Sequence, residues 1–179
     1  MRAAKRLVAG ISLALAAIAL PAPARAQVSE SEVKAAFLPR FARYVTWPTY
    51  QRPGAGQPFV LCVVGADPFG STLDKAAEGQ SVDGHRVIVR RIGSGGAGSC
   101  HIAFVHGSKT QPTGQLLAGL DGRPVLTVTD ARGGSQRGII HFAVVGGKVR
   151  FFIDEKEAAR RSLSINSRLL ALAVGVRTR

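Results

Sequence analysis

Acidic, aromatic and sulfur-containing residues are all scarce in this 179-residue chain. It has 11 Asp+Glu against 24 Lys+Arg, 6% aromatic residues, two cysteines and one methionine. Aromatic residues are not interleaved with basic ones, which argues against a single-strand nucleic-acid binder. Heptads and a Gly-X-Y period are absent, which excludes a coiled coil and a collagen. With 46% hydrophobic and only 20% charged residues, the chain is too apolar for a disordered protein, and we expect one globular domain.

The longest apolar run lies near the start of the chain. A basic segment, residues 1–6, precedes the run Leu7–Leu20, and the small-residue triplet Ala24-Arg25-Ala26 follows it. This three-part pattern is typical of a secretory signal peptide, and the run is too short to span a bilayer. We therefore expect residues 1–26 to be removed, leaving an exported domain over residues 27–179 with no membrane span. The alternative is an uncleaved N-terminal anchor.

The charge remains strongly positive after this removal. The signal peptide carries four basic residues, so its loss lowers the formal charge from +13 to +9. Export separates the mature protein from cytoplasmic DNA and RNA, and we expect no nucleic-acid partner. The excess of positive charge instead favours an acidic protein partner, an anionic surface or solubility.

Cys62 and Cys100 are the only cysteines. An even number of cysteines in an oxidising compartment favours one disulfide. Closing a loop of 37 intervening residues would stabilise the fold by about 4 kcal/mol in the chain-entropy model. The alternative is two separate buried thiols, because spacing does not establish geometry. A catalytic cysteine is disfavoured, since no neighbouring residue marks a lowered pKa.

The pattern along the chain alternates between helices and strands. A capping box at Ser29 and Glu32 predicts a helix that runs to about Thr46, interrupted by Pro39. Further helices are predicted over 71–78, 112–120, 155–161 and 165–176. Strands are predicted over 59–64, 85–92, 100–105, 124–129, 139–145 and 148–153, the last two joined by a Gly-Gly turn. The pattern predicts a three-layer α/β/α sandwich, with a mostly parallel sheet and a C-terminal antiparallel hairpin.

Several motifs resemble functional sites but lack the required context. Residues 93–98 spell G-x-G-x-x-G, yet they precede a strand where a dinucleotide site requires a helix. Residues 65–72 have P-loop spacing, but Ser71 replaces the phosphate-binding lysine. The four histidines do not have metal-ligand spacing, and no nucleophile elbow is present. We therefore expect no enzyme activity, no cofactor and no metal.

The order of six segments resembles the YfiR family of periplasmic proteins, also called the domain-of-unknown-function 4154 family. The resemblance covers about Val33 to Val176. The segments are Lys34–Leu38 with Trp47-Pro48, Leu61–Gly70, Cys100–Ile102, Val125–Val128, Lys148–Ile153, and Ala158-Ala159 through Leu172-Ala173.

This resemblance implies a regulatory rather than a catalytic protein. It implies that the chain binds the periplasmic sensor domain of an inner-membrane diguanylate cyclase and restrains cyclic-di-GMP synthesis and biofilm formation. Cys62 and Cys100 match the family's paired cysteines, which implies a disulfide with a role in redox control. Whether that bond is structural or switching stays open, as does the oligomeric state, a homodimer included.

Two function hypotheses remain. The first is a protein-binding regulator with Phe37, Phe41 and Trp47 as candidate partner contacts, although their helical spacing fits core residues equally well. The second is a small-ligand-binding module that serves another membrane sensor or transport system. Open α/β sheets hold ligands at strand-end loops, and the candidate ligand residues there are Asp67, Phe69, Gly70, Asp130, Gly133 and Gly134.

Overall fold

The computed structural model describes residues 28–93 and 99–178. The expected signal peptide, residues 1–26, and most of the G-x-G-x-x-G segment therefore lie outside the described residues. Within the described ranges, no helix is long and apolar enough to cross a membrane.

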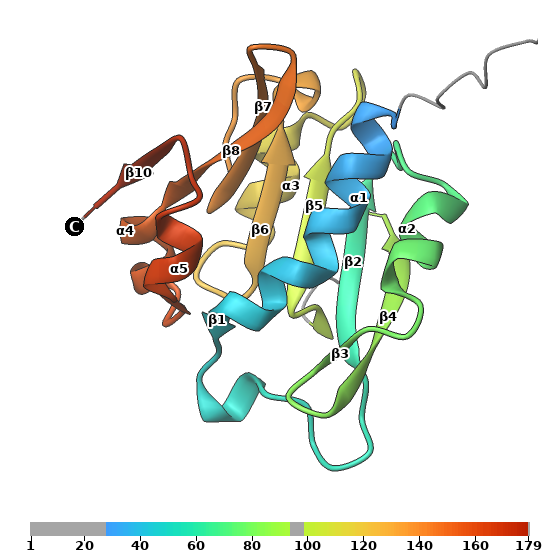
Figure 1. Cartoon of the computed structure of the whole chain (residues 1–179), viewed down its shortest axis with the longest axis vertical. Helices are drawn as coiled ribbons and strands as arrows, with labels where there is room; N and C mark the ends of the chain where they lie inside the picture. Colours follow the sequence, from blue (N-terminus) through green and yellow to red (C-terminus); the bar gives the residue numbers. More distant parts are fainter. Residues whose placement is uncertain (1–27, 94–98, 179) are drawn as a thin grey trace, which may run out of the picture.

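An eight-stranded sheet forms the centre of the fold (Figure 1), in the order β10-β8-β7-β6-β5-β2-β4-β3. Strands β4, β2, β5, β6 and β7 are parallel, while β8 runs antiparallel to β7. A separate antiparallel pair joins β1 to β9. The strands are β1 (Val45–Thr46), β2 (Phe59–Gly65), β3 (Ser81–Val82), β4 (His85–Ile92), β5 (Ile102–His106), β6 (Leu126–Asp130), β7 (Ile140–Val145), β8 (Lys148–Asp154), β9 (Ser164–Ile165) and β10 (Gly175–Arg177).

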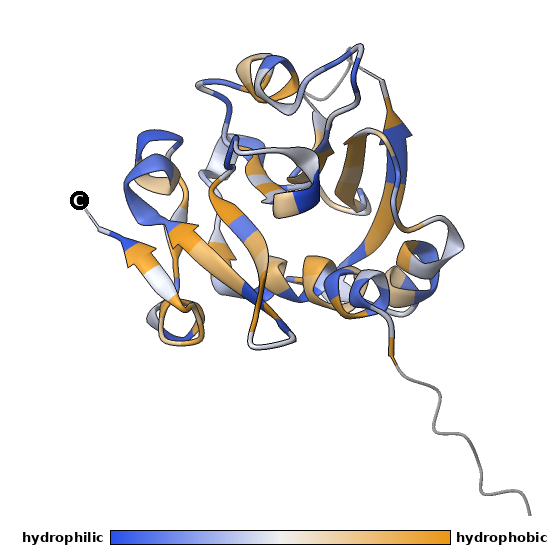
Figure 2. Cartoon of the chain, turned by 90° about the horizontal axis from the view of Figure 1, so that it is seen from above, coloured by the Kyte–Doolittle hydropathy of each residue, from blue (hydrophilic) through white to orange (hydrophobic). Residues whose placement is uncertain are grey.

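Helices cover both faces of this sheet, as Figure 2 shows from above. Figure 1 places α1 and α2 in front of the sheet and α3 behind it. The helices are α1 (Glu30–Phe41), α2 (Ser71–Ala77), α3 (Thr113–Ala118), α4 (Glu155–Arg160) and α5 (Ser167–Leu170), with 3-10 turns η1 (Ala42–Tyr44), η2 (Thr49–Gln51) and η4 (Ala131–Gly133). The predicted fold class, an α/β sandwich with a mostly parallel sheet and an antiparallel hairpin, is confirmed.

The central strand β2 is buried on both faces, as its continuous apolar sequence predicts. Phe59, Leu61 and Val63 pack in the core on the α1 side. Val60, Cys62 and Val64 belong to a second cluster with Leu116 and Leu120 on the α3 side. Strand β2 pairs with β4 on one side and β5 on the other. This is the order required to bring the two cysteine segments together.

Helix α1 begins as predicted but ends earlier. Ser29 accepts a hydrogen bond from the Glu32 backbone N–H at 3.2 Å, and Glu32 accepts one from the Ser29 N–H at 2.6 Å. The prediction of a helix to Thr46 is wrong: the helix ends at Phe41, two residues after Pro39. The next residues form a 3-10 turn, and Val45 and Thr46 then pair with β9. Pairing with a segment more than a hundred residues away therefore outweighs the local helical period.

The prediction of a helix over 165–176 is also wrong. The structure has the end of β9, the single turn of α5 and the edge strand β10 in this segment. Asn166 caps α5 by accepting a hydrogen bond from the Arg168 N–H at 2.9 Å. Residues 175–177 pair in parallel with 152–154 of β8. The backbone of β8 offers these residues sheet hydrogen bonds, which a sequence period does not reveal.

Candidate functional site

The two cysteines form a disulfide that joins neighbouring segments of the sheet. Cys62 lies in β2 and Cys100 lies just before β5, with their Cα atoms 5.8 Å apart. Both residues are fully buried, in the cluster that packs against α3. The predicted disulfide is confirmed, and it ties β2 to the start of β5.

The three candidate partner residues contribute to the packed core. Phe41 and Trp47 are buried, whereas Phe37 is only partly buried. Phe37 and Phe41 stack at 5.7 Å between ring centroids, and both pack against Phe142 and Phe151 of the hairpin. Phe41 and Trp47 thus act as core residues in this conformation. Phe37 is the one of the three with an exposed part.

The first candidate ligand loop is held by its own aspartate. Asp67 accepts hydrogen bonds from the backbone N–H groups of Phe69 at 2.8 Å and Gly70 at 3.2 Å. Its second oxygen accepts one from Arg91 at 2.7 Å, and Arg91 also pairs with Asp74. Phe69 is buried against Phe104 of β5. The Asp67 carboxylate therefore stabilises the turn that begins α2.

The second candidate loop contains a buried ion-pair network. Asp130 at the end of β6 is only 2% exposed. It accepts hydrogen bonds from Lys34 of α1 at 2.7 Å and the Gly133 N–H at 3.0 Å, and it lies 3.2 Å from His106 Nδ1. Burial acts to raise the pKa of the Asp130 carboxyl, but Lys34, His106 and Gly133 together hold that pKa below its usual value. Lys34 also pairs with Glu30 at 2.6 Å.

The two loops meet at one cavity of about 250 Å³ beside the N-terminus of α1. Phe69 from the first loop and Asp130 from the second both line it. Gly70, Gly133 and Gly134 do not line it. The sequence analysis missed Lys34, which projects from α1 to Asp130. The available signal is a lysine four residues after Glu30 on a helix whose other inward residues are apolar.

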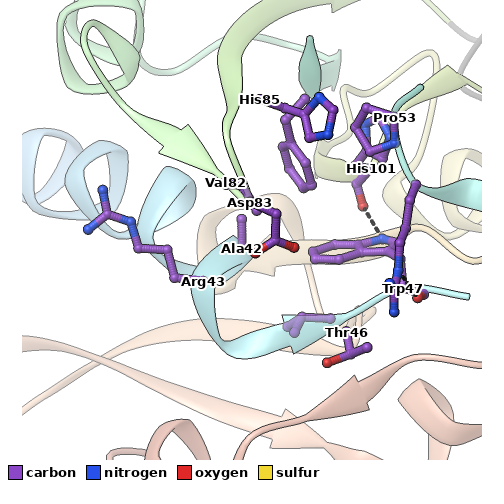
Figure 3. Close-up of a pocket in the computed structure, with 12 residues that line it drawn as sticks. Ala42, Arg43, Thr46, Trp47, Pro53, Val82, Asp83, His85 and His101 are labelled. Atoms are coloured by element: carbon purple, nitrogen blue, oxygen red, sulfur yellow. Dashed lines mark hydrogen bonds between the residues drawn. The ribbon is translucent and has the colours of Figure 1, made fainter. Parts of the chain in front are cut away.

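A larger hollow, of about 450 Å³, lies at the opposite end of the parallel strands (Figure 3). Trp47 donates its indole N–H to the His101 carbonyl oxygen at 3.2 Å, and Phe59 stacks on the His101 ring at 4.5 Å. The His101 Nδ1 atom accepts the Val60 N–H at 2.9 Å. Burial is the main cause that lowers the pKa of His101. The rim carries Arg43, Arg52, Asp83 and His85.

The sequence analysis did not predict this hollow because its walls come from segments far apart in the chain. The lining residues lie within 42–53, at 59, within 82–85 and at 101, and no local motif links these four segments. Within the described ranges, no three His, Cys, Asp or Glu side chains are grouped so that they could hold a metal ion. The hollow therefore offers an aromatic floor and a mixed-charge rim suited to contacts with a small molecule or a protruding side chain.

Comparison with protein-family models identifies a family. The model of the YfiR/HmsC-like family, domain of unknown function 4154, matches residues 31–174. The match runs from the first turn of α1 to the residue before β10 and includes both cysteines. A search of curated proteins gave no match.

Proposed function

The chain belongs to the YfiR/HmsC-like family, and from this membership we propose that it restrains an inner-membrane diguanylate cyclase by binding the cyclase's periplasmic sensor domain. The family is one of periplasmic regulators rather than enzymes, and membership implies a membrane-associated regulatory partner. Binding would lower cyclic-di-GMP and hence biofilm formation. The observation that carries the proposal is the family match over residues 31–174.

Phe37 is our candidate for direct contact with the partner. It is the partly exposed member of the aromatic cluster that joins α1 to the β7–β8 hairpin. Phe41 is buried and stacks on Phe37, so it would support the contact surface from beneath, whereas Trp47 is buried beside Phe59 and His101. A partly exposed ring on a well-packed base is the type of anchor that dominates protein interfaces.

We further propose that the disulfide gates this binding. A periplasmic dithiol would reduce it by transferring two electrons and two protons, which would give two cysteine thiols and an oxidised donor. Reduction would free Cys100, which directly precedes His101, and the His101 carbonyl oxygen accepts the Trp47 indole N–H. This chain of contacts links the disulfide to Trp47, which directly follows β1.

A calorimetric titration tests the proposal. Residues 27–179, oxidised and then reduced, would be titrated against the purified periplasmic domain of the candidate cyclase, with free thiols counted in each sample. We expect tight binding by the oxidised protein and weaker binding by the reduced protein. Equal binding by both would make the bond purely structural. Absence of binding by both would contradict the cyclase proposal.

Paired variants locate the contact. Phe37→Ala should weaken binding by about tenfold or more, as expected for loss of an aromatic anchor. Tyr50→Ala is the matched control, because Tyr50 is a 77% exposed aromatic residue that lies outside α1, in the 3-10 turn η2. Equal effects of the two changes would argue against α1 as the contact surface.

A second candidate function is the binding of a small ligand for another sensor or transport system. The observation that favours it is the cavity between the two strand-end loops, which Phe69 and Asp130 share. A ligand that binds only the folded protein raises its melting temperature. Thermal scans against a panel of small periplasmic metabolites should then show stabilisation in the wild type and less in Arg132→Ala, a change in the cavity wall.

A further inference from the structure

Apolar side chains are exposed around the β7–β8 hairpin. Val144 is 52% exposed and Val145 47%, and both precede the Gly146-Gly147 turn. Leu172 and Val174, between α5 and β10, are 63% and 46% exposed. Together these are four of the six large exposed hydrophobic residues in the described part of the chain.

Pairing in the sheet brings the two groups close together. Val144 pairs with Val149, and the Val174 N–H donates to the carbonyl oxygen of Phe151, two residues further along β8. Strand β6 pairs with β7 only as far as Phe142. The rest of the hairpin therefore extends beyond β6, and Figure 1 shows its turn at the top of the molecule.

The sequence around these residues carries charge of one sign. Residues 131–153 and 158–178 contain no Asp or Glu. Lys148 and Arg150 of β8 are exposed, and they form no ion pair with another residue that the structure describes. We call this basic and apolar region the hairpin surface; it consists of Val144, Val145, Lys148, Arg150, Leu172 and Val174.

We propose that the hairpin surface binds an anionic phospholipid bilayer. A projecting tip with apolar side chains and adjacent cations matches a membrane interface, where binding depends on buried apolar area and attraction to anionic lipids. A second copy of the chain is a poor fit, because the two basic rims would repel each other. The few residues of the hairpin surface are also far fewer than the roughly 20–30 residues per side of a standard protein interface.

Such binding would hold the protein at the membrane surface whether or not a protein partner is present. Binding would be weak and reversible, because three exposed valines and one leucine bury little area. It would also decrease with salt, since exposed charges are screened over about a Debye length. The inference does not depend on the proposed cyclase partner, because lipid vesicles contain none.

Co-sedimentation with vesicles tests this inference. Residues 27–179 should sediment with vesicles of phosphatidylglycerol mixed with phosphatidylcholine, and not with phosphatidylcholine alone. High salt should release the protein. Failure to sediment with phosphatidylglycerol at low salt would overturn the proposal.

Two double variants distinguish binding through the hairpin surface from attraction through the net charge of the protein. Lys148→Gln with Arg150→Gln should lower vesicle binding by about tenfold or more, because each cation near an anionic surface contributes about fivefold. Lys75→Gln with Arg86→Gln removes the same charge from exposed positions on α2 and β4, and should retain most of the binding. An equal loss in both pairs would overturn the proposal in favour of unspecific attraction.

A fluorescence reporter tests insertion directly. Val145→Trp should shift its emission to the blue when phosphatidylglycerol vesicles are added, whereas Tyr50→Trp should not. If the Lys148/Arg150 variant loses binding to an acidic periplasmic domain but keeps binding to vesicles, the hairpin surface serves a protein partner and the membrane proposal is overturned.

Discussion

Lys34 is a buried charge that stabilises the end of β6 beside the N-terminus of α1. It is 4% exposed and pairs with Asp130, itself 2% exposed. Lys34→Met should lower the free energy of unfolding by about 3 kcal/mol at neutral pH, because it leaves Asp130 buried without its cation. Urea unfolding measures the change. The double variant Lys34→Met with Asp130→Asn should recover part of the lost stability. If its loss equals the sum of the two single losses, Lys34 and Asp130 are not coupled.

The pH dependence of the same variant follows from Asp130. In the wild type the carboxyl's pKa is lowered, so its contribution to stability is present above the unfolded pKa and is lost as the pH falls through the folded pKa. Without Lys34 the pKa should rise, and the carboxyl should protonate at a milder pH. The difference in free energy of unfolding between the wild type and Lys34→Met should therefore become smaller as the pH falls from neutral to about pH 4. A constant deficit would show that Asp130 stays ionised without Lys34.

His101 should make the fold sensitive to mild acid. Burial lowers its pKa below the 6.5 of a free histidine, and His141, also buried, is shifted in the same direction. As the pH falls, the unfolded chain therefore takes up protons before the folded protein does. The free energy of unfolding present above about pH 6.5 is then lost, by at most about 1.4 kcal/mol per pH unit for each histidine. His101→Asn keeps an acceptor for the Val60 N–H without titrating. Unfolding midpoints at several pH values should show a shallower slope for this variant.

At the scale of elements, the β7–β8 hairpin depends on its turn. Gly146 and Gly147 have φ of +57° and +71°, as a two-residue turn between twisted strands requires. Gly147→Val should destabilise the protein by about 1–2 kcal/mol, because a β-branched residue is strained at positive φ. Gly146→Asn is the control and should change stability by about 0.5 kcal/mol or less, since asparagine tolerates this region. Thermal unfolding of the two variants distinguishes turn strain from loss of glycine itself.

At the scale of the whole molecule, the disulfide is the main covalent constraint on the described fold. Cys62→Ala with Cys100→Ala should lower the free energy of unfolding by about 4 kcal/mol, as expected for opening a loop of this length. Dithiothreitol should destabilise the wild type by a similar amount and leave the double variant unchanged. A variant as stable as the oxidised wild type would show that the bond serves a role other than stability.

Residue order and local period were sufficient to predict much of the fold. The parallel strands, the Gly-Gly hairpin, the capping box and the disulfide each leave a local signal: a continuous apolar run, a turn dipeptide, a Ser/Glu pair or a cysteine count. The order of six sequence segments was also sufficient to indicate the family. The partner contacts could not be predicted equally well, because helical spacing does not distinguish a buried ring such as Phe41 from an exposed one.

Other features arise only when distant segments meet. Thr46 leaves the helix because β9 pairs with it, and residues 175–177 form a strand because the edge of β8 is free to bond them. Lys34 meets Asp130 across 96 residues, and the hollow at Trp47 is assembled from four separate segments. A backbone hydrogen bond or buried ion pair across such separations depends on the position of its partner, which a local period does not specify.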